Sequence, residues 1–227
     1  MSVKLWCMSY SGAVAEYVDR LSDAEPPAFE LKNLREIRGY LDSLGTVAGP
    51  YWRHHVLSTD LSGMPRPRLR ITDPAFDISL FNRGLNFVSA RLAQVLGLGD
   101  DVIQYIDADC SECSEPVRAK GYRVINPRVF ANPMDRQRMS GVFIDVPRPD
   151  GSITHIWKPD LPHPARPAPP IYWRQDFVPP APLFSVPGAQ WTLVTDALAD
   201  QVMRAGFPDV TFIDYAQAGV VYRSATD

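Results

Sequence analysis

The sequence predicts a mixed α+β fold: a single domain with two strand–helix–strand units and a long proline-rich irregular insertion. Three observations predict it. The chain has 227 residues, is 45% hydrophobic and 22% charged, and holds 5 Trp, 9 Tyr and 10 Phe, so it can bury a substantial core. A strand–helix–strand pattern occurs twice, about 106 residues apart. The 22 prolines are about twice the usual share, and twelve of them lie between Pro147 and Pro187.

Proline lacks a backbone N–H and interrupts both helices and central strands, so regular elements are expected first where it is scarce. The windows poor in proline are 1–25, 75–115 and 188–207. In the first window, Val3 to Met8 suits a short strand and Ser11 to Leu21 a short helix with one apolar face. The chain therefore begins with a strand followed by a helix.

Residues 28–75 are less regular. Apolar side chains recur there at spacings of three and four, at Leu31, Leu34, Ile37, Leu41 and Leu44. This spacing predicts a helix that stops near Gly45. Together with the opening elements, this stretch forms a less regular N-terminal part, residues 1–75, of one domain covering 1–227.

The two copies of the repeat have the same order of segments. The first copy runs from Leu85 to Gly97 and continues with Val102 to Ile106; the second runs from Trp191 to Val202 and continues with Gly206 and Val210 to Ile213. In each copy an apolar segment ends at Ser89 or Thr195, whose hydroxyl can accept a hydrogen bond from the first helical turn. The glycine after each helix permits a left-handed cap. We expect two strand–helix–strand units, although this arrangement is generic enough to recur by chance.

Between the two units, three segments are expected to be strands: 121–129, 141–146 and 153–157. The last two are joined across Asp150-Gly151 and predict a hairpin. The following proline-dense segment should be extended backbone at 162–170, pinned by its flanking aromatic rings. These rings are Trp157, Tyr172, Trp173, Phe177 and Phe184. The domain thus divides into a first unit with central strands (76–146), a proline-rich excursion (147–187) and a second unit (188–227).

The charge and cysteine content exclude several classes of function. The net charge of −3 lacks the basic excess that nucleic-acid binding selects for. Three cysteines do not make an even disulfide set, so reduced thiols in the cytoplasm are the simpler expectation. We expect no secretory signal and no membrane span, because no stretch of 18 apolar residues occurs.

Charge is segregated along the chain. Six acidic residues and no basic one lie between Asp100 and Glu115. This segment is either solvated surface or an acidic patch that steers a basic protein partner. The sequence also repeats Tyr-Trp-Arg, at 51–53 and 172–174, and these residue types anchor either a core or an interface. The candidate partner-binding residues are Asp101, Asp107, Asp109, Glu112, Glu115, Tyr172 and Trp173.

No pattern indicates a reaction. Cys110 and Cys113 form a Cys-x-x-Cys that resembles half a zinc site, but only Cys7 and the histidines could complete it. Carboxylates around the pair should raise the pKa of the thiols, which disfavours a redox role. Motifs for metalloprotease, serine hydrolase, phosphate-loop and dinucleotide sites are absent. We therefore expect no enzyme activity, no bound metal and no cofactor.

Several segments in order resemble one family of bacterial proteins. These segments are 87–93, 122–126, 135–140 and 193–198, followed by Gly206 and 210–212. They are similar to motifs of immunity protein family eleven of bacterial polymorphic toxin systems. Matched by position, the family-motif residues are Ser89, Asn126, Asp135, Ser140 and Thr195. Ser89 and Thr195 are interpreted as helix caps and Asn126 as a turn residue. The family pattern has Ser at the position of Thr195, and Pro127 and the long proline segment also depart from it.

The resemblance implies a noncatalytic cytoplasmic protein that binds and neutralises a cognate toxin encoded by an adjacent gene, without nucleic acid or membrane as a partner. A homodimer is left open. The first alternative is a metal- or small-ligand-binding, enzyme-like domain that uses His54, His55 and the thiols. The second is an adaptor that presents the polyproline segment 162–170 to an aromatic groove.

Overall fold

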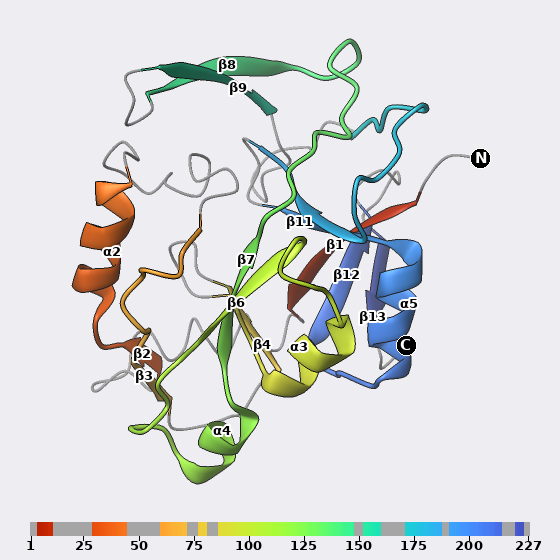
Figure 1. The fold of residues 1–227 in the computed structure, drawn as a ribbon. Helices are drawn as coiled ribbons and strands as arrows, with labels where there is room; N and C mark the ends of the chain where they lie inside the picture. Colours follow the sequence, from red (N-terminus) through yellow and green to blue (C-terminus); the bar gives the residue numbers. More distant parts are fainter. Residues whose placement is uncertain are drawn as a thin grey trace.

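A computed structural model describes residues 4–10, 29–44, 60–71, 77–80, 86–147, 152–159, 171–187, 191–214 and 221–224. It has a mixed α+β architecture with several small sheets (Figure 1). The predicted helix at 11–21 and the polyproline segment at 162–170 lie outside the described residues, as does the turn at 150–151. The class predicted from the sequence is confirmed at this level.

The described helices and strands are short and alternate along the chain. They are β1 (Leu5–Tyr10), β2 (Phe29–Leu31), α2 (Leu34–Ser43), β3 (Leu69–Ile71), β4 (Ile78–Leu80), β5 (Asn86–Val88), α3 (Ala90–Leu96), β6 (Ile103–Asp107), α4 (Glu115–Lys120), β7 (Arg123–Pro127), β8 (Gly141–Pro147), β9 (Ile153–Pro159), β10 (Leu183–Ser185), β11 (Thr192–Thr195), α5 (Asp196–Arg204), β12 (Val210–Asp214) and β13 (Val221–Ser224). The helix predicted before Gly45 is thus α2, and the predicted hairpin is the antiparallel pair of β8 and β9.

Each predicted strand–helix–strand unit is present, and each is split by a third strand. In the first unit, β5 and β6 both pair antiparallel with β7, which lies between them in the sheet order β4-β5-β7-β6. In the second unit, β11 and β12 both pair antiparallel with β1, in the order β10-β11-β1-β12-β13. The two outer strands of each unit therefore run parallel to each other, joined by the helix.

The caps of the two helices agree with the sequence only in part. Ser89 caps α3, because its Oγ accepts a hydrogen bond of 3.0 Å from the backbone N–H of Leu92. Thr195 precedes α5 but makes no side-chain cap, so that prediction is wrong for the second helix. Gly97 (φ 60°) and Gly206 (φ 70°) both adopt the left-handed conformation expected after a helix.

The helices α3 and α5 pack together against both large sheets. Leu92, Ala93 and Leu96 of α3 and Leu198, Ala199 and Val202 of α5 are buried in one apolar cluster with residues of β1, β5, β11 and β12. The two helices lie side by side in Figure 1. The two repeat units therefore share their apolar interior.

A separate apolar cluster, the aromatic cluster, holds the rings that flank the proline-rich segment. Phe184 is fully buried there, Trp157 and Phe177 are nearly so, and Trp173 packs against them. Phe177 and Phe184 lie 5.7 Å apart between ring centroids. These rings anchor the backbone on either side of residues 160–170 to the sheet that contains β1 and β11.

Candidate partner-binding surface

The hairpin of β8 and β9 extends from one end of the molecule (Figure 1). Val142, Phe143 and Ile153 on it are 61%, 62% and 57% exposed, and they are three of the four exposed large hydrophobic side chains of the described residues. Among those residues the hairpin forms a two-stranded sheet of its own. Exposed apolar side chains on such a hairpin are typical of protein-binding surfaces; Phe143 and Ile153 lie on one of its faces and Val142 on the other.

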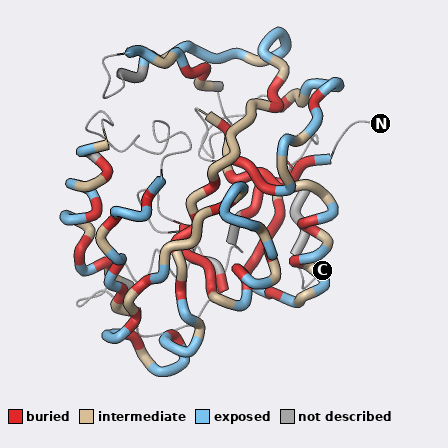
Figure 2. The backbone as a smooth tube through the Cα atoms, viewed as in Figure 1, coloured by how far each residue is buried: buried red, intermediate tan, exposed pale blue. Residues whose placement is uncertain are grey.

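One end of the hairpin is fixed to the body of the protein. Ile156 and Trp157 of β9 are buried, and Trp157 belongs to the aromatic cluster together with Leu5 and Leu193. A side chain at Gly141 would meet the Trp157 ring at 2.5 Å, so glycine allows the indole to pack against β8. Figure 2 shows the result: the hairpin is largely exposed and is buried only where β9 returns to the body.

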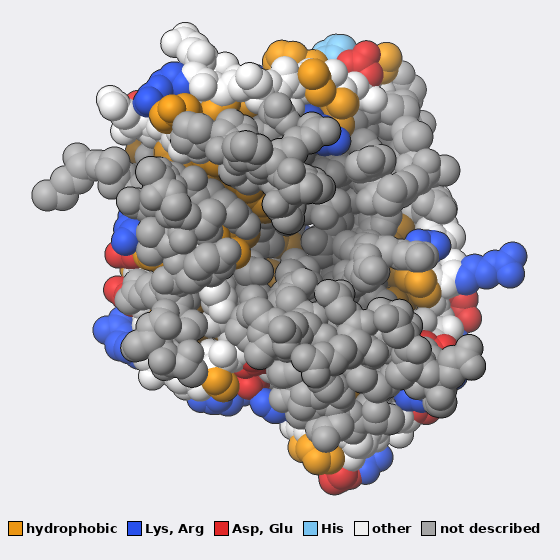
Figure 3. Space-filling view, turned by 180° about the vertical axis from the view of Figure 1, so that it is seen from behind, with side chains coloured by type: hydrophobic (Ala, Val, Ile, Leu, Met, Phe, Trp, Pro, Cys, Tyr) orange, Lys and Arg blue, Asp and Glu red, His pale blue; other side chains and the backbone are white. Residues whose placement is uncertain are grey.

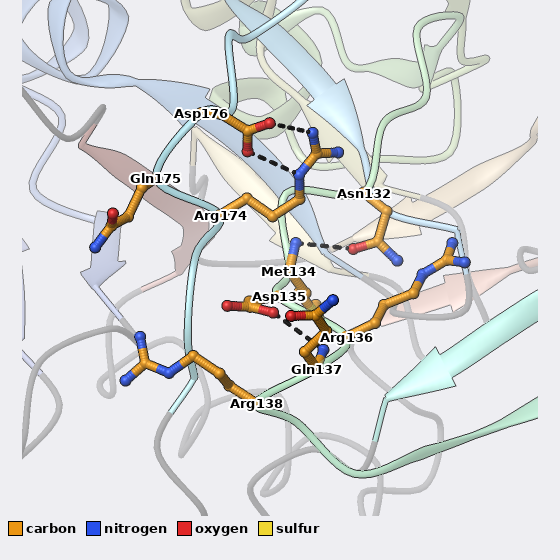
Figure 4. Close-up of a pocket in the computed structure, with 9 residues that line it drawn as sticks. All are labelled: Asn132, Met134, Asp135, Arg136, Gln137, Arg138, Arg174, Gln175 and Asp176. Carbon is orange, nitrogen blue, oxygen red and sulfur yellow. Dashed lines mark hydrogen bonds and ion pairs between the residues drawn. The ribbon is translucent and has the colours of Figure 1, made fainter.

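A groove of about 830 Å³ lies between the loop 132–138, which leads into β8, and the segment 174–176 (Figure 4). Two backbone hydrogen bonds of 2.8 Å join its walls, from the N–H of Asp135 to the carbonyl of Tyr172 and from the N–H of Arg174 to the carbonyl of Pro133. The loop is shaped by its own side chains, because Asn132 accepts from the N–H of Met134 and Asp135 from that of Gln137. Hydrogen bonds within the loop and between the two walls therefore fix the shape of the groove.

Three arginines line the groove, and they differ in their partners. Arg174 donates two hydrogen bonds, of 3.1 and 3.0 Å, to the carboxylate of Asp176, and these bonds and its charge lower the pKa of Asp176. Arg136 and Arg138 instead lie over aromatic rings. Arg136 is 5.7 Å from the ring centroid of Phe143 and 5.6 Å from that of Trp157, and Arg138 is 3.8 Å from that of Tyr172. Arg136 thus connects the groove to the hairpin.

The acidic residues predicted to bind a partner are mostly paired within the chain. Asp107 forms an ion pair of 2.8 Å with Arg123 across β6 and β7, Glu115 pairs with Arg118, and Glu112 lies 4.0 Å from Lys32. The N–H and hydroxyl groups of Ser111 lower the pKa of Asp109, with smaller contributions from Arg66 and Arg68. Asp101 is exposed. The segment 100–115 is therefore partly neutralised by basic residues that lie elsewhere in the sequence.

The other two predicted partner-binding residues lie next to the groove. Tyr172 carries Arg138 on its ring, and Trp173 packs edge-on against Trp191 at 6.4 Å. Both are half-buried. The sequence indicates these two aromatics as candidate interface residues, but it does not mark Arg136, Arg138 or the exposure of the hairpin. The run Val142-Phe143-Ile144, which departs from strand alternation, was the available signal for the hairpin.

The family-motif residues occupy separate places. Ser89 is buried and donates a hydrogen bond of 2.6 Å to Asp77. Asn126 lies within β7 opposite Gln104, to which it donates at 3.0 Å, so its interpretation as a turn residue is wrong. Asp135 lines the groove, Ser140 is exposed immediately before β8, and Thr195 ends β11. Only Asp135 and Ser140 adjoin the candidate surface.

The cysteine residues are buried and unpaired. Burial raises the pKa of Cys113 to about 11, with smaller contributions from Cys110 and Asp109, and raises that of Cys7 to about 12. Nearby carboxylates thus act in the expected direction but less than burial does. The histidines 54, 55 and 163 and the tripeptide 51–53 lie outside the described residues. Within the described part of the chain, no three His, Cys, Asp or Glu residues are grouped so as to hold a metal ion.

No family model matches the chain, and no curated protein is similar to it. None of the helices in the described segments is long and apolar enough to cross a membrane.

Proposed function

We propose that this chain is a noncatalytic immunity protein that binds a cognate bacterial toxin and blocks it by occupying its surface. The toxin as partner is supported by the order of the sequence motifs. The binding surface is supported by the β8–β9 hairpin, whose side chains Val142, Phe143 and Ile153 are each more than half exposed. Covering what remains exposed of such side chains against a partner contributes about 1–2 kcal/mol each.

The hairpin is better supported as the toxin-binding surface than the acidic segment 100–115 is. Asp107, Glu112 and Glu115 already have basic neighbours, so a partner would have to compete with internal ion pairs. Burying the exposed apolar side chains of the hairpin requires no internal ion pair to be broken. The space-filling view from behind shows hydrophobic, acidic and histidine side chains gathered at the hairpin end of the molecule (Figure 3). The proposed compartment is the cytoplasm, which suits three unpaired thiols.

The first test is co-expression with the product of the adjacent gene. We expect that product to arrest growth alone, to be harmless with this chain, and to copurify with it. If no neighbouring product is toxic or binds, the proposed function is wrong.

The second test changes the hairpin alone. The triple variant Val142→Ser, Phe143→Ser, Ile153→Thr should weaken toxin binding by at least about 100-fold, because it removes most of the apolar area of the surface. Val178→Ser is the matched control, since Val178 is 78% exposed but lies outside the hairpin. Equal binding by both variants would show that the hairpin is not the interface. Unchanged thermal unfolding of the triple variant verifies that its fold is intact.

A further inference from the structure

The lining of the groove keeps a positive charge once its internal pairs are taken into account. Arg174 and Asp176 neutralise each other through two hydrogen bonds. One carboxylate oxygen of Asp135 accepts a hydrogen bond from the N–H of Gln137, which stabilises the conformation of the loop. Arg136 and Arg138 pair with no carboxylate of the described residues. Asp135 keeps its negative charge, so the lining carries one net positive charge, which these two guanidinium groups provide.

Stacking on aromatic rings leaves these two arginines able to bind a carboxylate. A guanidinium that lies over a ring uses its face, whereas its five N–H donors point outward from its edges. Two adjacent donors match the two oxygens of a carboxylate. The rings of Tyr172, Phe143 and Trp157 also restrict the arginine side chains before binding, which lowers the entropic cost of ordering them.

The shape of the site favours an extended chain over a small anion. Figure 4 shows the side chains of Arg136 and Arg138 leaving the loop in opposite directions. The loop continues into β8, which pairs only with β9 among the described strands, so an extended segment can lie beside its other edge as an added strand. Every second side chain of such a strand would lie on the face of β8 that carries Phe143, next to Arg136.

We propose that this groove binds an extended acidic segment of the partner protein, with carboxylates on Arg136 and Arg138. This inference rests on the proposed function and specifies the chemistry of its partner. A nucleic acid fits less well, because its phosphate at every nucleotide would also lie against Asp135 and Asp176, whereas an acidic peptide needs carboxylates only at the two arginines. The chain's own acidic segment 100–115 also fits less well, since its carboxylates largely pair with basic residues of the chain.

The experiment uses defined probes with the full chain. Fluorescence anisotropy would measure binding of a labelled (Glu-Thr)5 peptide, with (Lys-Thr)5 as its charge-reversed counterpart and inorganic phosphate and a ten-residue oligothymidine as competitors. We expect binding of (Glu-Thr)5 alone, weakened by salt and little displaced by phosphate or oligothymidine. Absence of binding to the acidic peptide, full displacement by phosphate, or tighter binding of oligothymidine would each overturn the proposal.

Variants then locate the binding. Arg136→Gln combined with Arg138→Gln should weaken (Glu-Thr)5 binding by about tenfold or more, and Arg136→Lys should fall between, because Lys keeps the charge but not the paired donors. Arg118→Gln is the control, since α4 lies at the opposite end of the molecule from the hairpin (Figure 1). If Arg118→Gln weakens peptide binding as much as the double arginine variant does, the peptide is bound by the general surface charge and not by the groove. Peptide-dependent self-association in size-exclusion chromatography would also contradict a one-to-one site.

A toxin assay separates this inference from the proposed function. If the hairpin variant loses toxin neutralisation while the double arginine variant keeps it fully, the proposed function stands and the acidic segment is wrong. If the peptide binds as expected but no adjacent gene product is neutralised, the groove chemistry stands and the immunity function is wrong.

Discussion

The two strand–helix–strand units have the same arrangement but obtain their middle strand in different ways. In the first unit β7 follows β6 closely in the sequence, whereas in the second unit β1 comes from the opposite end of the chain. Leu5 pairs with Thr195, a separation of 190 residues. The same local sequence pattern therefore forms the same unit whether its third strand is near or distant.

The starts of the two helices are also held differently. Ser89 accepts from Leu92 and donates to Asp77, whose other oxygen accepts from Lys120 at 2.8 Å. At the start of α5 the indole N–H of Trp6 donates to Asp196 at 2.6 Å, so β1 fixes the helix in place of a Thr195 cap. Each unit thus uses a polar contact to tie its helix to the sheet, although only one uses the cap residue.

The largest effect tests whether the two units share one interior. Leu92→Ala and Leu198→Ala should each lower the free energy of unfolding by about 2–5 kcal/mol, because both side chains are buried in the cluster between α3 and α5. Gln94→Ala, on the exposed face of α3, is the control. Urea denaturation followed by fluorescence and circular dichroism should show one transition in each case. Two separate transitions would mean that the units unfold independently.

The next effect distinguishes the two cap residues. Ser89→Ala should cost about 2–4 kcal/mol, because it removes the cap and leaves a buried oxygen of Asp77 without a donor. Thr195→Ala should stay within about 0.5 kcal/mol. Chemical denaturation measures both. Equal losses of unfolding free energy would show that Ser89 and Thr195 contribute equally to stability despite their different contacts.

A smaller effect is expected at the glycines that follow the helices of both units. Gly97→Ala and Gly206→Ala should each cost about 1–2 kcal/mol, because both glycines have positive φ. Gly39→Ala in α2 is the counterpart, with no atom within 4 Å of the added Cβ, and should stabilise by about 0.5–1 kcal/mol. Thermal unfolding of the three variants checks the signs. If Gly206→Ala instead stabilises the protein, the two glycines are not equivalent, and the two units differ at the C-terminal ends of their helices.

The smallest effect at neutral pH comes from Cys7 in β1. Burial raises its pKa from 9.0 to about 12, so between these values the thiol ionises only in the unfolded chain. The stability contributed by the neutral thiol is complete below pH 9 and is lost as pH rises from 9 to 12, by up to about 1 kcal/mol per pH unit. Cys7→Ala should flatten this dependence in denaturation series at increasing pH. An unchanged slope would assign it to other groups.

The sequence located what is local and missed what depends on pairing between distant segments. A capping hydroxyl, an apolar helical face and a following glycine all lie within about 20 residues, so both units could be predicted. Nothing local to Asn126 indicates that β7 would lie between β5 and β6, and its amide type suggested a turn. The acidic segment looked unpaired because Arg123 and Lys32 approach it only in the folded chain.

The candidate surface was harder to predict for the same reason. Tyr172 and Trp173 were identifiable as interface residue types, but the groove beside them forms only where 132–138 meets 174–176. Arg136 and Arg138 occur in the sequence as an ordinary basic pair. The rings of Phe143, Trp157 and Tyr172 orient these two side chains. These rings are in position only once the hairpin and the segment 172–176 have folded.

The central position of β1 also affects how the protein is made. At about 5–20 residues per second, a ribosome needs about 10–40 seconds after synthesising β1 to reach β11 and β12, its two neighbours in the sheet. During that time neither edge of this apolar strand can pair with β11 or β12. The first unit, whose strands follow one another closely, can assemble while the nascent chain is still growing. The second can close only when the last part of the chain emerges, so translation itself imposes an order on the assembly of two otherwise similar halves.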